Sequence, residues 1–380
     1  WDYAPNDGDI AFTSAPNLYE DYVISSSSSG KIWDTPFFSI FGSLLNSNSK
    51  LIVLDEKNGE AIYDPIDLPA ASHSTPAVAD GKIFVACQNI KGSNLFAYDL
   101  YTGEELWNIS TGEPYGIVGK SSPVCADGKV FVTCNQKDSI FESGKNMLIS
   151  VDASDGEVLW NKSIGVPKIS YIDLFNGIYT SAPIFSPCFY EDTLFTVSTN
   201  GTFYALNPSN GEEKWSYLIS DNSPLSGNFY ASPLVVKDKV YVIKGRTIFC
   251  FDTKHSDSVE VDWSYTLPIP GDVYIGMISP PMVYSSPVYA DGLLIISSTH
   301  DYTNLDGALY CIGEYEKNLQ GDIKSSSIEV PDHHWWEEFN ADTIVSNNNT
   351  IQFSILDEND NILGDFKNIN GSSNNISILK

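Results

Sequence analysis

The chain contains six cysteines, the side chains with the most varied chemistry in it, and their positions favour a structural role. No Cys-x-x-Cys pair occurs, so the spacing typical of a structural zinc site is missing from the sequence. Cys250 and Cys311 take one position of a repeated pattern at which other copies carry alanine or serine, and Cys87 and Cys134 share a second position. Small residues at equivalent positions predict buried thiols that act as small hydrophobic side chains, in preference to disulfide bridges.

Two other clusters carry atoms that a metal ion could use. His333-His334 and Glu337-Glu338 would share a face only in a helix, whereas the aromatic residues around them favour a strand. Asp301, Asn304 and Asp306 form an oxygen-rich stretch, but the spacing does not match an EF-hand loop, and we expect a solvated loop. We therefore predict no metal site and no catalytic residue. A carboxylate pair for glycoside hydrolysis has no signature in a sequence, so a glycan-cleaving hydrolase stays open as an alternative.

The charge of the chain narrows the choice of partners. Its 49 acidic and 21 basic residues give a formal net charge of −28, which repels phosphate backbones and anionic lipid, so we expect no nucleic acid partner. Arg246 is the single arginine, so an arginine cluster for phosphate is missing. No apolar run could cross a bilayer, and we expect a secreted chain whose leader has been removed. Six sequons would accept glycans in such a protein: Asn108, Asn161, Asn200, Asn348, Asn370 and Asn375.

A pattern of two small residues followed by proline recurs along the chain at a period typical of propellers and solenoids. Its six copies are Ser14-Ala15-Pro16, Ser74-Thr75-Pro76, Ser121-Ser122-Pro123, Ser181-Ala182-Pro183, Ala231-Ser232-Pro233 and Ser285-Ser286-Pro287. A turn and a β-rich run follow each copy, as at Asp80-Gly81, Asp127-Gly128 and Asp291-Gly292. Asp-Gly between alternating apolar runs predicts a hairpin, because both central positions of the turn need a positive φ.

A second pattern, Asp-x-x-x-Gly-Glu-x-x-aromatic, follows within the same repeats. Its copies are Asp55 to Tyr63, Asp99 to Trp107, Asp152 to Trp160 and the variant Asn207 to Trp215. The glycine, such as Gly103 or Gly156, takes the left-handed position of a hairpin, and the aromatic residue lies on the next strand. We expect the repeated tryptophans, with Trp263 in the fifth copy, to pack between blades and not against a flat cofactor.

Each repeat thus supplies four antiparallel strands, which make one propeller blade. We predict an all-β fold, a six-bladed β-propeller of four-stranded antiparallel blades over residues 1–328. The sixth copy ends at Leu309 to Ile312 without an aromatic outer strand, and Trp1-Asp2-Tyr3 can supply that strand and close the ring without an open edge. Residues 329–380 form a small C-terminal β appendage, the start of a sandwich domain, with strands expected at Trp335–Phe339, Thr350–Leu356 and Asn375–Leu379 around a turn at Asp357–Asn361.

Three features, the proline pattern, the Asp-Gly turns and the Asp-x-x-x-Gly-Glu-x-x-aromatic pattern, resemble the pyrroloquinoline-quinone-like (PQQ-like) propeller repeats. The resemblance covers about residues 1 to 315. That family includes quinoprotein dehydrogenases and the propeller lipoprotein of bacterial outer-membrane assembly, so the resemblance implies a fold more than a function. The dehydrogenases carry two adjacent cysteines joined by a disulfide bridge and a tryptophan that lies beneath the quinone. They also carry side chains that bind calcium. No two cysteines are adjacent here, so we expect no cofactor, neither PQQ nor calcium, and keep a PQQ-dependent oxidoreductase as an alternative. The lysine bias and asparagine-rich loops resemble surface proteins of methanogenic archaea.

Antiparallel strands place alternate connections on opposite faces of a propeller, so the long, aromatic loops should gather on one face. The residues predicted to bind a ligand there are Trp33, Phe38, His73, Lys120, Tyr171, Phe175, Tyr179, Tyr230, Tyr274, Tyr284, His300 and Tyr302. His73, Lys120, Tyr230 and Tyr284 immediately precede the proline-led strands and should ring the central channel. We predict a non-catalytic, monomeric propeller of the cell surface that binds a protein or glycan partner without inserting into the membrane.

Overall fold

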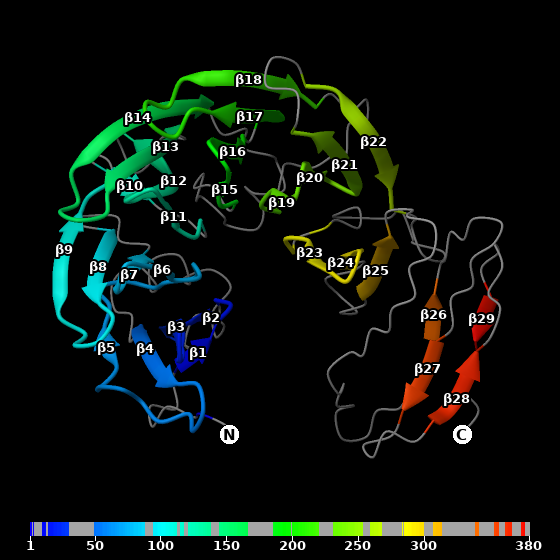
Figure 1. Ribbon diagram of the computed structural model, residues 1–380, viewed down its shortest axis with the longest axis horizontal. Coiled ribbons are helices and arrows are strands. Elements are labelled where there is room, and N and C mark those ends of the chain that lie inside the picture. Colours follow the sequence, from blue (N-terminus) through cyan, green and yellow to red (C-terminus); the bar gives the residue numbers. More distant parts are fainter. Residues whose placement is uncertain are drawn as a thin grey trace, which may run out of the picture. The chain divides into compact units, whose positions relative to one another are not determined.

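The computed structural model is all-β, and the part of the chain that it describes contains no helix (Figure 1). The described part therefore has no helix that could span a membrane. It describes residues 1, 3, 10–12, 14–29, 49–87, 94–111, 115–117, 121–137, 144–165, 185–198, 200–219, 231–253, 259–267, 283, 285–299, 307–313, 339–341, 353–356, 362–366 and 374–376.

The first three repeats each form one antiparallel sheet. Blade 1 contains β1 (Ile10–Phe12), β2 (Asn17–Tyr19), β3 (Tyr22–Ser29), β4 (Lys50–Asp55) and β5 (Ile66–Asp67), with β1 and β2 both paired to β3. Blade 2 contains β6 (Ala77–Ala79), β7 (Lys82–Ala86), β8 (Leu95–Asp99) and β9 (Glu105–Ile109) in chain order. Blade 3 contains β10 (Tyr115–Ile117), β11 (Val124–Ala126), β12 (Lys129–Lys137), β13 (Lys145–Asp152) and β14 (Val158–Gly165), with β10 and β11 both paired to β12.

The next three sheets follow the same plan. Blade 4 contains β15 (Cys188–Tyr190), β16 (Thr193–Val197), β17 (Thr202–Leu206) and β18 (Glu213–Leu218). Blade 5 contains β19 (Leu234–Val236), β20 (Lys239–Lys244), β21 (Thr247–Asp252) and β22 (Val261–Thr266), and blade 6 has three strands, β23 (Val288–Ala290), β24 (Leu293–Thr299) and β25 (Gly307–Gly313). These six sheets confirm the predicted all-β propeller class.

The chain forms two compact units. The first contains Trp1–Tyr289 and Leu294–Leu309, and the second contains Ala290–Leu293 and Tyr310–Lys380. Within the second unit β26 (Phe339–Ala341) pairs with β29 (Asn374–Ile376), and β27 (Phe353–Leu356) pairs with β28 (Ile362–Phe366). The strand expected at Thr350–Leu356 is therefore present as β27. The sequence analysis did not anticipate β28, because its Gly364 and Asp365 interrupt the apolar run. Residues 335–338 and the His333-His334 pair lie outside the described residues.

The predicted Asp-Gly turns have the left-handed backbone that their sequence requires. Asp80 and Asp127 both have φ +50°, and the glycines that follow them have φ +68° and +69°. Blades 1, 4 and 5 lack the glycine but keep a positive φ at Glu20, Glu191 and Lys237. The turn geometry is thus common to the repeats, whereas the Asp-Gly pair is only its most recognisable sequence.

Apolar side chains between neighbouring sheets form the core. One cluster joins residues of blades 3, 4 and 5, among them Phe131, Phe195 and Phe251, and two further clusters join blades 2 and 3 and blades 1 and 2. The inner strands β2, β6, β11, β15 and β19 contact one another in that order, and Figure 1 shows the last strand of each of these blades on the outside. Each blade therefore buries its faces against its neighbours in the chain.

Two of the outer tryptophans, Trp107 and Trp160, lie between blades, as predicted, whereas the ring contacts of Trp215 and Trp263 are with aromatic residues of their own blades. The Trp107 ring of blade 2 lies against Gly156 of blade 3, and its indole N–H donates to the Ala153 carbonyl at 3.2 Å. Trp160 repeats the arrangement against Gly211 of blade 4 and donates to the Pro208 carbonyl at 3.0 Å. Tyr63 occupies the same place against Gly103. We call this arrangement, an aromatic ring against the hairpin glycine of the next blade, the aromatic latch.

Replacing the latch glycine should cost more stability than replacing a turn glycine in open space. A Cβ on Gly156 would lie 2.9 Å from the Trp107 ring at φ +82°, whereas a Cβ on Gly128, at φ +69°, meets nothing within 4 Å. We expect Gly156→Ala to lower the free energy of unfolding by about 2–4 kcal/mol, from left-handed strain and overpacking together, and Gly128→Ala by about 1–2 kcal/mol from strain alone. Equal losses for the two variants in chemical denaturation would contradict the latch.

Candidate functional site

The two kinds of tight turn lie at the same end of each blade. The N–H of Leu100, after the third strand of blade 2, donates to the Gly81 carbonyl at 2.9 Å, and Ala153 donates to Gly128 at 2.9 Å in blade 3. We call this end the turn face. The opposite end, where the proline-led strands begin and the second strands end, is the loop face. The prediction that the two kinds of tight turn share one face is therefore confirmed.

A series of hydrogen bonds joins neighbouring blades where their proline-led strands begin, at the loop face. The N–H of Thr75 donates to Ser122 Oγ at 2.9 Å, and the N–H of Ser122 donates to Ser186 Oγ at 2.8 Å. The N–H of Ser186 then donates to Ser232 Oγ at 2.8 Å, and that of Ser232 to Ser286 Oγ at 3.0 Å. This hydroxyl ladder (Thr75, Ser122, Ser186, Ser232 and Ser286) runs from blade 2 to blade 6 through the residue before each proline.

The ladder corrects the fourth copy of the proline pattern. The pattern in the sequence predicted Ser181-Ala182-Pro183, but Ser186 carries the hydrogen bonds, and Pro187 leads directly into β15. Ser181-Ala182-Pro183 lies outside the described residues. The distance from the proline to the following turn could have identified the right copy, because Pro187 precedes Glu191 by the same four residues that separate Pro123 from Asp127.

The first residue of the pattern fixes the inner strand to the second strand of its own blade. Ser14 Oγ donates to the Ser26 carbonyl at 2.9 Å, and Ser285 Oγ donates to the Ser297 carbonyl at 3.0 Å. In blade 3 the serine is the acceptor, and the N–H of Thr133 donates to Ser121 Oγ at 3.2 Å. These bonds hold the start of the inner strand in a fixed position on the loop face.

His73 is the predicted binding residue that the structure describes, and buried serines hold the chain on both sides of it. Ser72 Oγ donates to Ser26 Oγ at 3.0 Å and to the Ala86 carbonyl at 2.9 Å. Ser74 Oγ donates to the same Ala86 carbonyl at 3.0 Å, and Ser26 Oγ donates to the Ser74 carbonyl at 2.9 Å. Because His73 itself is half-buried between fully buried neighbours, its imidazole is presented from a fixed backbone at the junction of blades 1 and 2.

The other eleven predicted binding residues lie outside the described residues, so the structure does not bring them together or separate them. They are Trp33, Phe38, Lys120, Tyr171, Phe175, Tyr179, Tyr230, Tyr274, Tyr284, His300 and Tyr302. The Asp301, Asn304 and Asp306 cluster lies outside them as well. Their position on the loop face stays a prediction.

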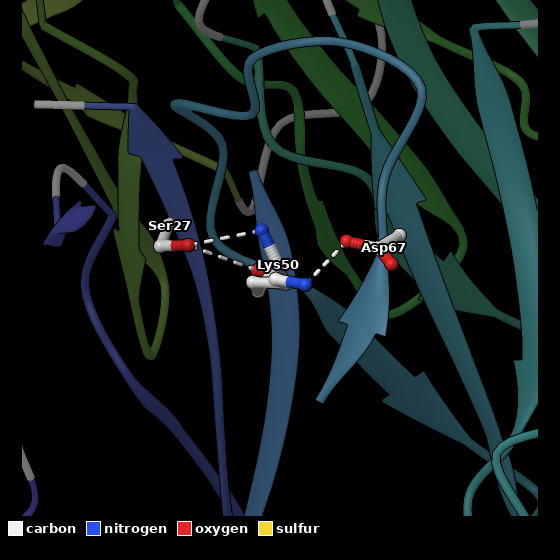
Figure 2. A network of polar contacts seen from close by, with 3 residues as sticks. All are labelled: Ser27, Lys50 and Asp67. Atoms are coloured by element: carbon white, nitrogen blue, oxygen red, sulfur yellow. Dashed lines mark hydrogen bonds and ion pairs between the residues drawn. The ribbon is translucent and has the colours of Figure 1, made fainter. Parts of the chain in front are cut away.

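A polar network at the loop-face end of blade 1 was not anticipated. Figure 2 shows Lys50 of β4 between Ser27 of β3 and Asp67 of β5. The Lys50 N–H donates to Ser27 Oγ at 2.9 Å, and its ammonium forms an ion pair with the Asp67 carboxylate. The Lys50 side chain is only 18% exposed, and its ammonium joins β4 to β5, while the backbone N–H of the same residue bonds to β3. A single lysine in a strand carries no sequence signal for such a role.

The turn face carries a small cavity between blades 2 and 3. It has a volume of about 290 Å³ and a lining that includes Asp80, Lys82, Asp127, Lys129 and Asp152. Carboxylates and ammonium groups alternate there, so its charge is largely balanced. Within the part of the chain that the structure describes, no group of three His, Cys, Asp or Glu side chains is placed to hold a metal ion.

The perturbed pKa values of the described residues all move away from neutral pH. A backbone N–H of Thr102 and further hydrogen bonds lower the pKa of Asp99, and the Ser154 hydroxyl and N–H lower that of Asp152. Burial raises the pKa of the Cys125 and Cys134 thiols to about 12 and also raises those of the other perturbed cysteines and tyrosines. Ion pairing raises the pKa of the two perturbed lysines. Poised acids and bases need shifts in the opposite direction.

The six cysteines all lie within the described residues and form no disulfide bridge there. Cys87, Cys134 and Cys250 are buried, as predicted, but the prediction was wrong for Cys311, which is exposed in the three-stranded blade 6. Cys250 pairs across the sheet with Trp263, as Ala97 pairs with Trp107, so a small residue faces each of these tryptophans. A quinone cofactor bearing carboxylates needs cationic partners. The single arginine, Arg246, instead donates to the Leu267 carbonyl at 2.6 Å. Arg246 is therefore engaged within blade 5 and does not supply such a partner.

The repeated blades, the latch and the ladder define a propeller of the PQQ-like class. The chain belongs to the family described as outer membrane protein assembly factor BamB, which its sequence matches over residues 48–318. A search of the curated proteins finds no match.

Several solved structures share the fold. The quinohemoprotein alcohol dehydrogenase of Comamonas testosteroni is 13% identical with a TM-score of 0.52, over 77% of this chain and 52% of its own, so this chain spans about half its length. A europium-containing methanol dehydrogenase is 12% identical with a TM-score of 0.50, over 80% of this chain and 69% of its own. BamB from Moraxella catarrhalis is 13% identical with a TM-score of 0.40, over 75% and 82%. The likeness to the two dehydrogenases shows the propeller fold and leaves the activity undecided.

Removing one hydroxyl of the ladder should destabilise the propeller measurably. Ser186→Ala leaves the N–H of Ser122 without its acceptor, and we expect a loss of about 1–2 kcal/mol in the free energy of unfolding. Ser216→Ala, an exposed serine of the same blade, is the matched control and should change stability by less than about 0.5 kcal/mol. If the two variants unfolded at the same denaturant concentration, the ladder would have no energetic role.

Proposed function

We propose that this chain is a non-catalytic binding propeller that acts outside the cytoplasm and holds a protein partner on its loop face. The observation that carries the proposal is the rigid support that the blades offer at the loop face. The hydroxyl ladder and the serines around His73 fix the strands from which the connections on that face start.

The family supports a protein partner in preference to a glycan. Its description is that of an outer-membrane protein assembly factor, a role in which proteins are the partners and the envelope is the place of action. The net charge of −28 disfavours nucleic acid and anionic lipid as partners. A PQQ-dependent oxidoreductase is the second candidate, since the dehydrogenases share the fold at a TM-score of 0.50 or above.

Photocrosslinking from each face tests the binding proposal. A benzoylphenylalanine at His73 reports on the loop face, and one at Lys129, which is also half-buried, reports on the turn face. Against an envelope extract of the source cells we expect a discrete protein adduct from position 73 and none from position 129. Adducts from position 129 alone would place the site on the wrong face, and hits on a glycan array without any protein adduct would make the partner a glycan.

Titration with PQQ and calcium separates the binding propeller from the oxidoreductase. We expect no change in melting temperature and no shift in the quinone absorbance, because the single arginine donates to the Leu267 carbonyl and no group of three metal ligands is placed among the described residues. The same titration of a Lys50→Ala variant serves as a comparison, because Lys50 provides the cation at the loop-face end of blade 1. A saturable absorbance change with the parent chain would favour the oxidoreductase.

A further inference from the structure

The cavity on the turn face between blades 2 and 3 lies where two side chains are smaller than their counterparts at the preceding junction. Ser154 and Ala153 of blade 3 take the places that Tyr101 and Leu100 have in blade 2. The backbone is alike at these places, because the N–H of Tyr101 and that of Ser154 each donate to the aspartate two residues earlier, at 2.9 and 2.8 Å. A serine therefore stands in blade 3 where the same backbone carries a tyrosine in blade 2.

Tyr101 fills the corresponding space between blades 1 and 2. A Cβ on Gly81 would lie 3.1 Å from its ring, and the ring meets that of Tyr22 in blade 1 edge to face, with 6.1 Å between centroids. The Tyr101 hydroxyl donates to a carboxylate oxygen of Glu20 at 3.4 Å. This junction therefore holds a phenol group between the turns of two blades, with a carboxylate as its acceptor.

The cavity offers a phenol group the same surroundings, with one exchange. Gly128 corresponds to Gly81, and a Cβ there meets nothing within 4 Å, so the space in front of this glycine is open. Asp80 corresponds to Glu20, with φ +50° and +53° at the two turn positions, so a carboxylate is again present. Lys82 stands in place of the blade 1 tyrosine, and an ammonium group attracts the face of an aromatic ring. The lining thus matches a phenol that the described residues do not provide at this junction.

In blade 4 a lysine of the outer strand covers the corresponding turn. Lys214 corresponds to Leu159 of blade 3, and its ammonium donates to the Asp192 carbonyl at 2.6 Å and to Thr193 Oγ1 at 2.9 Å. Leu159 lines the cavity, makes one apolar wall of it and is 41% exposed. The space that Tyr101 fills in blade 2 and Lys214 bridges in blade 4 is therefore open in blade 3.

We propose that this cavity is a second binding site, separate from the partner on the loop face, and that it takes a small phenolic molecule. Its volume of about 290 Å³ lies at the lower limit of ligand pockets and suits a single ring. The ring contacts Leu159 and Lys82, and its hydroxyl donates to Asp80 as the Tyr101 hydroxyl donates to Glu20. A small molecule is favoured over a tyrosine of a protein, because the short turns around the cavity offer a protein little further surface.

Exchanging the two equivalent residues tests the proposal with para-cresol, which is the tyrosine side chain as a free molecule. We expect the parent chain to bind para-cresol in the millimolar range typical of a single-ring ligand, by saturation-transfer NMR and equilibrium dialysis. Ser154→Tyr fills the cavity with a ring of the chain itself, so binding is lost while the melting temperature is kept or raised. Ser209→Tyr places the same residue at the corresponding exposed position of blade 4 and leaves binding unchanged.

Tyr101→Ser gives the reverse result, because it opens the space between blades 1 and 2 and raises the amount of bound para-cresol. The control para-methylanisole has the same ring without a hydroxyl to donate, and it binds the parent more weakly. A parent chain that does not bind para-cresol, or a folded Ser154→Tyr variant that still binds it, would overturn the proposal. A strong loss of stability in Ser154→Tyr would overturn it too, since the cavity would then not accommodate a ring. Tighter binding of N-acetyltyrosine amide than of para-cresol would overturn the choice of a free phenol and point to a tyrosine of a protein.

Discussion

The contact between an aromatic ring and a hairpin glycine determines how neighbouring blades sit. At Gly103, Gly156 and Gly211 a Cβ would approach a ring of the preceding blade to within 3 Å, so the contact exists only because the side chain is absent. The same glycines also have positive φ, so the position requires glycine both for the left-handed backbone and for the space that the ring occupies. The indole hydrogen bond then fixes the rotation of the ring. Together these constraints set the spacing of the blades at their outer edge.

The hydroxyl ladder acts at the inner strands of the blades, opposite to the outer hairpins. At the junctions of blades 2 and 3 and of blades 3 and 4, a ladder hydrogen bond holds the inner strands and an aromatic latch holds the outer hairpins, so the neighbouring sheets are fixed at both edges with an apolar core between them. These contacts come from the strands, the tight turns and the residue before each proline. The loop face is therefore free to vary in length and composition, which suits a binding role, while the turn face stays short and charge-balanced.

Much of the fold could be predicted from the sequence because its rules are local. An Asp-Gly pair demands a left-handed turn, and the predicted φ values at Asp80 and Asp127 are present. The ladder could not be predicted, since serines before a proline carry no mark of which blade accepts from which. Only Pro183 fits the pattern of two small residues, because Phe185 precedes Ser186 and Pro187, and the distance to the turn at Glu191 is what identifies Pro187. The site was predicted through loop aromatics, of which the structure describes His73, so its composition remains an inference from topology.

The junction of blades 4 and 5 shows what the latch can be exchanged for. The long hairpin from Asp252 to Trp263 has no glycine, so the outer tryptophan of blade 4, Trp215, packs instead on Phe203 of its own blade at 5.3 Å. Phe251 of blade 5 takes over the contact between blades, at 4.9 Å from Phe203.

Lys239 stabilises the altered hairpin of blade 5 from within. Its ammonium lies 3.1 Å from the Asp252 carboxylate and 2.6 Å from that of Asp262, so it joins all three strands around the long turn. Partial burial opposes the charge, yet the hydrogen bonds that the ammonium donates to the two carboxylates prevail and raise the pKa of Lys239. The same three-strand role falls to Lys50 in blade 1, where the fourth strand is also irregular. Degenerate copies of the repeat are thus tolerated when an ion pair across the sheet and an aromatic pair between sheets replace the lost latch, because the fold requires the burial of the junction and not the glycine itself.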